Sequence, residues 1–379
     1  MDITIEDLRT HARRRLPRAV FDYIDGGAED EVTLARNHDA FEQIAFRPRA
    51  LVDVSTIDRS TTILGQPIST PIILAPTGLS GMAAAKGELL AATAASRLGT
   101  IFTLSTMSAT SIEEVAVKAP GPWWFQLYVW RDRGLTRSLM DRAADSGYRV
   151  MVLTVDVPVL GRRERDLRNG ATIPPRITLR NASDTLRRWR WLADMARHPR
   201  VDFVNIRADD RPGSGPFLAL GPFVNSQFDP SVTWRDLEWF RSVWSGPLAL
   251  KGIMTSDDAA LAVEHGVDAI VVSNHGGRQL DGSPATIEVL PEIVDVVQER
   301  AEVIFDGGIR RGSDIVKALA LGARACMVGR AYLYGMAVAG TDGVQQAISI
   351  LSDELERTLA LLGRSSLAEL DRTAVRSAR

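Results

Sequence analysis

Short apolar runs recur along the chain, and segments whose apolar positions follow the period of an α-helix separate most of them. The runs Ile72–Ala75 and Ala269–Val272 are apolar throughout, which is typical of strands buried on both faces of a parallel sheet. Helical spacing occurs in segments such as Gly87–Leu98 and Leu135–Ser146. The predicted strands are Ile72–Ala75, Ile101–Leu104, Trp124–Leu127, Val150–Leu153, Leu248–Lys251, Ala269–Val272, Val303–Phe305 and Ala325–Val328.

The alternation of strand and helix predicts a closed α/β barrel. Parallel neighbours need a crossover connection, which the helices supply. Eight such units over roughly 260 residues have the size of a (β/α)8 or TIM barrel. We expect one domain over residues 1–379, with an N-terminal helical cap (1–70), the barrel (71–335), a long loop after the fourth strand (insertion 165–245) and C-terminal helices (336–379).

Composition narrows the class of protein further. The 379 residues are 45% hydrophobic and 24% charged, as in ordinary globular proteins, and the net charge of -2 gives no reason to expect nucleic acid as a partner. The single cysteine, Cys326, lies in a predicted strand and is expected to be buried. The N-terminus does not resemble a secretory signal and no apolar stretch is long enough to span a bilayer, so a cytoplasmic location is expected.

The segment after Ala269–Val272 carries the most informative chemistry. His275 and Arg278 stand three residues apart on a loop that Gly276 and Gly277 loosen. Histidine can take a proton near neutral pH, and arginine can hold a carboxylate through two parallel hydrogen bonds. A histidine after a strand is more often a loop or core residue, but the pair together indicates a base beside an anion clamp.

Polar or glycine residues follow every predicted strand, where TIM-barrel enzymes place their active sites. This regularity favours an enzyme over chance turns. The residues in question are Pro76-Thr77-Gly78, Ser105-Thr106, Gln126 and Tyr128, Thr154 and Asp156, Lys251-Gly252, Ser273 to Arg278, Asp306-Gly307-Gly308 and Gly329-Arg330.

Two of these positions allow more than one interpretation. Lys251 ends an apolar strand and is costly there without a partner; it is a Schiff-base nucleophile, a charge facing a cofactor ring, or a lysine that reaches the surface. Asp156 either stabilises a protonated His275 or is a structural loop residue. No metal site is assigned.

A phosphate site is predicted after the last two strands. Gly307 and Gly308, the arginines that follow them, and a helix expected to start near Gly312 would together favour an anion. Gly329 and Arg330 add to this end of the barrel, where many TIM barrels hold phosphate. Glycine turns with solvated arginines are the alternative. No Gly-x-Gly-x-x-Gly opens a helix after a first strand, so a Rossmann nicotinamide site is not expected.

With these residues in hand, the chain resembles the FMN-dependent L-2-hydroxy acid oxidase and dehydrogenase family from Leu16 to about Leu370. The resemblance implies a flavoprotein that converts a 2-hydroxy acid to a 2-oxo acid. The motifs that carry it are 21–30 (FDYIDGGAED), 75–78 (APTG), 125–128 (FQLY), 153–156 (LTVD), 273–279 (SNHGGRQ) and 306–312 (DGGIRRG).

The resemblance also implies a role for each matching residue. His275 is the base and Asp156 its partner; Tyr23, Arg163 and Arg278 bind the substrate carboxylate, Tyr128 binds the substrate hydroxyl, and Lys251 stabilises negative charge on reduced flavin. Whether the α-hydrogen leaves as hydride or as a proton stays open. The expected FMN contacts are Pro76, Thr77, Gly78, Ser105, Gln126, Thr154, Lys251, Ser273, Asp306, Gly307, Gly308, Arg310, Gly329 and Arg330.

Two departures from the glycolate oxidases of this family bear on substrate and electron acceptor. Gly78 replaces an alanine and Met107 a tryptophan, and glycine at the first position resembles the mandelate dehydrogenases. Both residues are expected to contact substrate. We expect a larger substrate, mandelate or lactate, with quinone as the acceptor; the alternative is an oxidase that reduces O2 to H2O2.

Association is predicted from one segment and from the resemblance. The run Arg187–Trp191, within residues 176–215, suits a membrane interface. It alternatively folds over the active site or packs between subunits. The resemblance suggests a homotetramer and a peripheral position on the inner face of the cell membrane.

One motif of the chain also occurs in other classes of protein. The motif at 306–312 also resembles IMP dehydrogenase and flavin-dependent isopentenyl diphosphate isomerase, but neither carries the segment at 273–279, and Cys326 is not on a loop. A non-catalytic barrel would be expected to lose His275, Arg278, Asp156 or Lys251, and all four are present.

Overall fold

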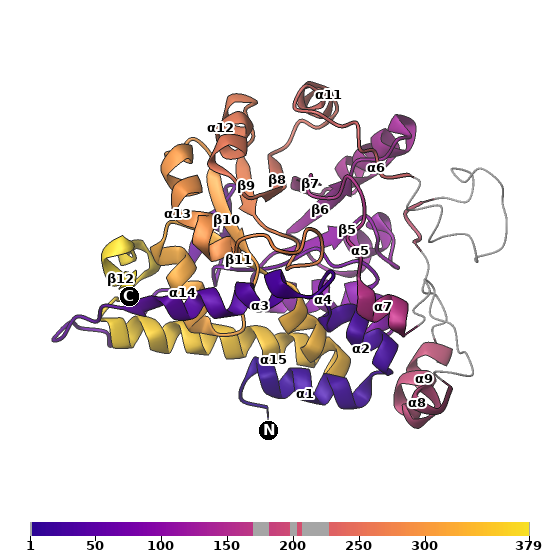
Figure 1. Cartoon of the computed structure of the whole chain (residues 1–379), viewed down its shortest axis with the longest axis horizontal. Helices are drawn as coiled ribbons and strands as arrows, with labels where there is room; N and C mark the ends of the chain where they lie inside the picture. The colour runs from indigo at the N-terminus through magenta and orange to yellow at the C-terminus, as the bar shows by residue number, and fades with distance from the viewer. Residues whose placement is uncertain (1, 170–181, 198–202, 207–226, 379) are drawn as a thin grey trace.

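The computed structural model describes residues 2–169, 182–197, 203–206 and 227–378, and its eight parallel strands form a closed barrel (Figure 1). The strands pair in the order β10-β11-β4-β5-β6-β7-β8-β9. Each overlaps one predicted strand, so the expected TIM barrel is confirmed. The strands are β4 (Ile72–Leu74), β5 (Phe102–Ser105), β6 (Trp123–Tyr128), β7 (Val150–Thr154), β8 (Leu248–Ile253), β9 (Ala269–Val272), β10 (Glu302–Asp306) and β11 (Ala325–Val328).

Alternate strand residues form two separate cores. Ile73, Trp124 and Val152 belong to a buried cluster inside the barrel, whereas their strand neighbours such as Leu74 and Phe125 belong to the core between strands and helices. The hairpin of β2 (Thr61–Ile63) and β3 (Gln66–Ile68) adds Ile63 and Ile68 to the inner cluster. This hairpin closes the amino-terminal mouth, and the carboxyl-terminal mouth remains for a site.

Capping side chains fix where several connecting helices begin. The N–H of Glu114 donates to Ser111 before α5 (Ile112–Lys118), and Asp132 accepts from two N–H groups of α6 (Arg133–Asp145). Thr255 caps α12 in the same way. The remaining helices around the barrel are α4 (Gly87–Arg97), α11 (Asp236–Val243), α12 (Ser256–Glu264), α13 (Thr286–Val297) and α14 (Gly312–Ala320), with a 3-10 turn at Ser80–Met82.

The cap packs beside the last long helix. It contains α1 (Ile5–Arg15), α2 (Arg18–Asp25), α3 (Val32–Asp39) and a 3-10 turn (Ala40–Gln43), and α1 lies along α15 (Arg330–Leu362) in Figure 1. Helix α15 passes the boundary expected at residue 335 and is interrupted at Ala339 and Gly340. Further on are 3-10 turns at Leu367–Glu369 and Arg372–Ala374, and β1 (Ile44–Phe46) pairs antiparallel with β12 (Val375–Ser377).

The described part of the expected insertion after the fourth barrel strand contains several short helices joined by turns and irregular segments. Helix α7 (Glu164–Arg168) starts it, and α8 (Ala182–Arg187) and α9 (Trp189–Arg197) follow. Residues 170–181, 198–202 and 207–226 lie outside the described residues. Cys326 is buried in β11, as expected.

Candidate active site

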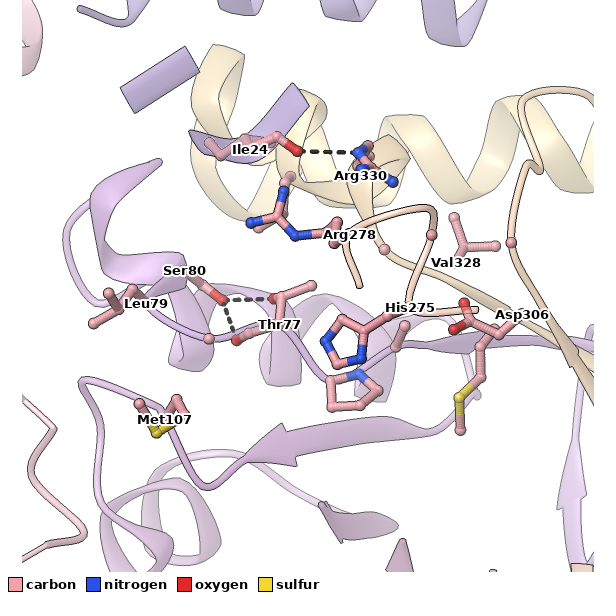
Figure 2. Close-up of a pocket in the computed structure, with 18 of the residues that line it drawn as sticks. Ile24, Thr77, Leu79, Ser80, Met107, His275, Arg278, Asp306, Val328 and Arg330 are labelled. Carbon is pink, nitrogen blue, oxygen red and sulfur yellow. Dashed lines mark hydrogen bonds between the residues drawn. The ribbon is translucent and has the colours of Figure 1, made fainter. Parts of the chain in front are cut away.

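A cavity of about 750 Å3 opens at the carboxyl ends of the barrel strands and extends under the cap (Figure 2). Residues from the cap, from the loops after several strands and from the start of α15 meet in it. Of the residues expected to form the site, those that line it are Tyr23, Pro76, Thr77, Gly78, Met107, Tyr128, Arg163, Lys251, His275, Arg278, Asp306, Gly307, Gly308, Arg310, Gly329 and Arg330.

His275 and Asp156 form a close pair. The Nδ1 atom of His275 lies 3.0 Å from Asp156 Oδ1 and 3.2 Å from Oδ2, although the residues are 119 positions apart. Strand β8 makes room for the carboxylate: it bulges at Gly252, where a Cβ would lie 2.6 Å from the Cβ of Asp156. With Nδ1 turned to Asp156, the ring leaves Nε2 for a reacting group.

Electrostatics prepare this pair for proton transfer. Burial lowers the pKa of His275, with Lys251 and Arg163 acting in the same direction and Asp156 opposing them. Burial works to raise the pKa of Asp156, but the charges of His275 and Lys251 outweigh it and hold that pKa below its usual value. At neutral pH the imidazole is therefore neutral beside an ionised carboxylate. Such a pair can accept a proton and stabilise the imidazolium that results.

Two guanidinium groups flank the ring of Tyr23. The Cζ atom of Arg278 lies 5.2 Å, and that of Arg163 5.9 Å, from the ring centroid. Arg278 donates to the backbone carbonyls of Tyr23 and Gly26 at 2.8 Å. The buried Nε of Arg163 has no hydrogen-bond partner in the part of the chain that the structure describes. The two cations can therefore receive a carboxylate.

Lys251 forms an ion pair with Asp306, which could not be predicted from the sequence around Lys251. Its Nζ lies 2.8 Å from Asp306 Oδ2 and donates to Ser273 Oγ at 2.7 Å. Ser273 in turn donates to Asp306 at 2.7 Å. The lysine therefore stays in the cavity wall and does not reach the surface.

Several expected cofactor contacts are buried and absent from the cavity lining. Ser105 donates to Gln126 Oε1 at 2.9 Å, and Gln126 Nε2 donates to Thr154 at 2.9 Å. These three residues, with Ser273, are at most 4% exposed. Ser105, Gln126 and Thr154 form a polar layer on the three successive strands β5, β6 and β7. Burial raises the pKa of the nearby Tyr128, so its hydroxyl stays protonated at neutral pH.

The end of the cavity where an anion is expected lies at the start of α15. Arg330 donates to the backbone carbonyls of Ile24 at 3.1 Å (Figure 2) and of Gly26 at 2.8 Å. Arg310 donates to the carbonyl of Ile309 at 2.8 Å. Among the described residues, only backbone oxygens therefore accept hydrogen bonds from these two side chains. Burial and the charge of Arg310 lower the pKa of Arg330 to about 10. It remains charged at neutral pH. A phosphate would supply the negative charge that this end lacks.

The expectation that the helix near Gly312 offers free N–H groups to this anion is wrong. The carboxylate of Asp314 accepts from the N–H groups of Arg310 and Arg311, at 3.0 and 2.9 Å, and Glu354 accepts from Gly312 at 2.8 Å. Acidic side chains therefore cap α14. Helix α15 instead begins at Arg330, and its N-cap residue, Gly329, provides no side-chain cap.

Sequence reasoning missed further residues of the site. His38 lies near the anion end, where burial and the charges of Arg310 and Arg330 lower its pKa to about 3. Phe228 packs edge-on against Tyr128, with ring centroids 5.3 Å apart. An aromatic residue before a turn does not by itself indicate, in the sequence, that it lines a site. The other unforeseen lining residues are Ile24, Ala75, Leu79, Ser80, Ala83, Leu160, Phe203, Ile309, Met327, Val328 and Leu333.

The run Arg187–Trp191 lies against the cap. Arg188 donates to the carbonyl of Arg14, and the indole N–H of Trp191 donates to Met82 at 2.8 Å, whereas Trp189 is 65% exposed. The other parts of the expected contact segment, 176–181, 198–202 and 207–215, lie outside the described residues. None of the helices that the structure describes has the length and apolarity to cross a membrane.

Comparison with known proteins gives a consistent result. A sequence profile of FMN-dependent dehydrogenases matches residues 12–377. The chain is 48% identical to an L-lactate oxidase of Nostoc sp. (95% of this chain, 94% of the relative) and 44% identical to a glycolate oxidase of Spinacia oleracea (99% and 96%). A crystal structure of the monotopic membrane protein (S)-mandelate dehydrogenase matches with a TM-score of 0.95 at 39% identity, over 99% of both chains.

Replacing Asp156 by asparagine is expected to lower the pKa of His275 further, because the variant keeps the side-chain shape but loses the charge that opposes burial. An NMR titration of the imidazole, assigned with His275→Asn, measures this. Asp229→Asn is the matched control, since Asp229 pairs with Arg133 instead. An unchanged or raised pKa in Asp156→Asn would contradict the described electrostatics.

Proposed function

The chain belongs to the family of FMN-dependent 2-hydroxy acid dehydrogenases and oxidases, and from this premise we propose that it oxidises an L-2-hydroxy acid of the mandelate or lactate type and passes the electrons to quinone. The oxidation of L-2-hydroxy acids with FMN is the activity of the family. The observation that carries the proposal is the His275–Asp156 pair in one cavity with the cations Arg163 and Arg278.

The substrate carboxylate binds between Arg163 and Arg278 in this proposal. Both guanidinium groups lie over the ring of Tyr23, and the Nε of Arg163 is buried without a partner among the described residues. A carboxylate there satisfies the buried charge and orients the α-carbon. The protonated hydroxyl of Tyr128 then donates a hydrogen bond to the substrate hydroxyl.

His275 holds the proton that leaves the substrate, whether that proton comes from the hydroxyl or from the α-carbon. Its Nε2 receives the proton, and the imidazolium is stabilised by Asp156 across Nδ1. FMN, when bound, would accept the two electrons of the bond that breaks at the α-carbon together with the second hydrogen of the substrate. The product is the 2-oxo acid, and His275 returns its proton to solvent or to the acceptor.

The residues present fit FMN. A flavin needs an anion site for its phosphate and a partly apolar wall for its ring, and one cavity offers both. In the proposal Arg310, Arg330 and the N-terminus of α15 hold the phosphate, while Lys251 lies where it can stabilise negative charge on the ring. The other contacts proposed are Pro76, Thr77, Gly78, Ser105, Gln126, Thr154, Ser273, Asp306, Gly307, Gly308 and Gly329.

Gly78 and Met107 support a substrate larger than glycolate. Both line the cavity, and a Cβ on Gly78 would lie 3.0 Å from the Cβ of Met107, so the glycine leaves space that an alanine would fill. Leu160, Phe203 and Phe228 add apolar wall to the same cavity. An aryl or branched side chain would bury apolar surface there.

The acceptor is proposed to be quinone, with oxygen as the alternative. The structural match to the membrane protein (S)-mandelate dehydrogenase favours a membrane-soluble acceptor. The 48% identity to an L-lactate oxidase supports the second candidate function, that of an oxidase that reduces O2 to H2O2.

Peripheral membrane contact is proposed through what we call the basic face. It comprises exposed arginines at the end of α1 and the start of α2 and the adjacent Trp189 and Arg190, whose guanidinium lies 5.4 Å from the indole ring. Clustered cations with an aromatic side chain suit an anionic membrane surface. The arginines of the basic face are Arg13, Arg14, Arg15, Arg18, Arg187 and Arg190. A homotetramer on the inner face of the cell membrane completes the proposal, on family resemblance alone.

Anaerobic rapid mixing tests the proposed reaction. Mixing the FMN-loaded protein with L-mandelate or L-lactate should bleach the flavin, because two electrons pass from the α-carbon. Bleaching that persists in air until a quinone is added would support the dehydrogenase, whereas fast recolouring in air would replace it with the oxidase. Glycolate is the comparison substrate. Failure of all three acids to bleach the flavin would refute the proposed reaction.

Gly78→Ala is expected to lower kcat/KM for L-mandelate about 10- to 100-fold, because the added methyl narrows the space beside Met107. L-Lactate should lose far less, since its methyl group is small. Steady-state kinetics with both acids measure the difference. The double variant with Met107→Ala should recover activity with mandelate, and equal losses for the two acids would argue against this pocket.

The basic face should bind vesicles that contain anionic lipid, and the binding should weaken as salt is raised. Co-sedimentation with vesicles is compared for the wild-type protein, for Trp189→Ala/Arg190→Gln and for the remote variant Arg97→Gln, which loses the same single positive charge. The first variant should lose binding and the second should keep it. No pelleting of the wild-type protein at low salt would contradict membrane docking.

A further inference from the structure

One short segment carries two of the charged groups of the site. Asp156, at one end of residues 156–163, contacts His275, and Arg163, at the other end, lies over Tyr23 beside Arg278. No helix or strand spans residues 157–162. The contacts that hold this segment against the loop after β9 therefore determine two distances. One is between His275 and the Asp156 carboxylate, and the other is between the guanidinium groups of Arg163 and Arg278.

Gln279 makes that connection with both ends of its amide. Its Nε2 donates to the carbonyls of Asp156 at 3.0 Å and of Val159 at 2.9 Å. Its Oε1 accepts from the N–H of Gly161 at 3.1 Å. Gln279 directly follows Arg278 in the chain. One side chain therefore links the segment that bears Asp156 and Arg163 to the loop that bears His275 and Arg278.

The backbone of Gly161 lies against the same peptide. A Cβ on Gly161 would meet the carbonyl oxygen of Arg278 at 2.3 Å and the Cα of Gln279 at 2.8 Å, distances that no real side chain could keep. The contact is therefore closed to any other residue without a shift of one loop. On its far side the segment meets the cap, where the carbonyl of Arg162 accepts from the N–H of Glu29 at 2.8 Å.

We propose that Gln279 is a positioning residue for the oxidation: its hydrogen bonds to residues 156–161 set Asp156 against His275 and Arg163 beside Arg278. This inference rests on the proposed function of these four residues. Gln279 is absent from the cavity lining and touches no reacting atom. It acts by fixing two loops whose catalytic groups must agree in position to a fraction of an ångström.

The test uses the FMN-loaded Gln279→Leu variant, which keeps much of the side-chain bulk and loses all three hydrogen bonds. Gln346→Leu is the matched control, because Gln346 Nε2 also donates to a backbone carbonyl, that of Asp2 at 3.1 Å, and Gln346 is absent from the cavity lining. Anaerobic stopped-flow gives the rate of flavin reduction per bound flavin. We expect Gln279→Leu to be about 10- to 100-fold slower, with a raised KM, and Gln346→Leu to match wild type.

The pH profile separates positioning from simple loss of stability. His275 faces Asp156, Lys251 and Arg163, and of these only the carboxylate favours its protonation. A loosened Asp156 leaves the imidazolium less stabilised, so the midpoint of the acidic limb should move to lower pH in Gln279→Leu. Gln279→Met, which keeps the side-chain length but neither donates nor accepts these hydrogen bonds, should show the same slow rate and shifted midpoint.

The rate of flavin reduction, the KM and the pH midpoint together test the role of Gln279. Wild-type rate, KM and pH midpoint in Gln279→Leu would overturn the inference, as would a defect that disappears when the rate is expressed per bound flavin. If Gln279→Leu does not fold, Gln279→Met and Gly161→Ala are judged by the same three quantities. If no 2-hydroxy acid bleaches the flavin of the wild-type protein, the proposed function is wrong. The inference about Gln279, which rests on that function, is then wrong as well.

Discussion

Closure of the barrel is the constraint from which the rest of the structure follows. Once all strands run in the same direction and β11 pairs with β4, their carboxyl ends must meet at one rim. Residues such as Asp156 and His275 are brought within hydrogen-bond distance by that requirement, not by proximity in the chain. The two cores explain why the closure is stable: inward side chains fill the barrel, and outward ones pack under the helices.

The rim that results is rich in positive charge. Lys251 is paired with Asp306 and Asp156 is occupied by His275, so the carboxylates of the site are already engaged. Arg278 and Arg330 are left with backbone carbonyls as partners among the described residues, and burial lowers the pKa of Arg278 to about 9. Buried cations in this state are costly until an anion arrives. In the proposed function, the same unpaired positive charge selects the phosphate at one end of the cavity and the substrate carboxylate at the other.

Local patterns in the sequence were sufficient to predict the barrel and much of its rim. Strand runs such as Ala269–Val272 are apolar throughout, and the polar residues after them could be placed at one mouth because parallel strands leave no other choice. Partners that depend on three-dimensional packing could not be predicted. Nothing near Lys251 in the sequence points to Asp306, and nothing near Phe228 points to Tyr128.

The expected helix at Gly312 shows the limit of motif reasoning in another way. The helix exists where it was predicted, but Asp314 and Glu354 occupy its N-terminus. The competing helix, α15, has no side-chain cap at Gly329, and its first residue, Arg330, bonds to the cap segment. A glycine-rich motif identified the correct end of the barrel, and the choice between two neighbouring helix termini depended on acidic side chains elsewhere.

The order of the strands also dictates when the protein can acquire its cofactor during synthesis. The barrel closes only when β11 reaches β4, and the anion end of the cavity is built from Gly329 and Arg330, which directly follow β11. A nascent chain on the ribosome has already made the cap, Asp156 and His275, but it lacks both the closing strand and the residues that would bind phosphate. The cavity that would hold FMN is therefore complete only in a finished or nearly finished polypeptide.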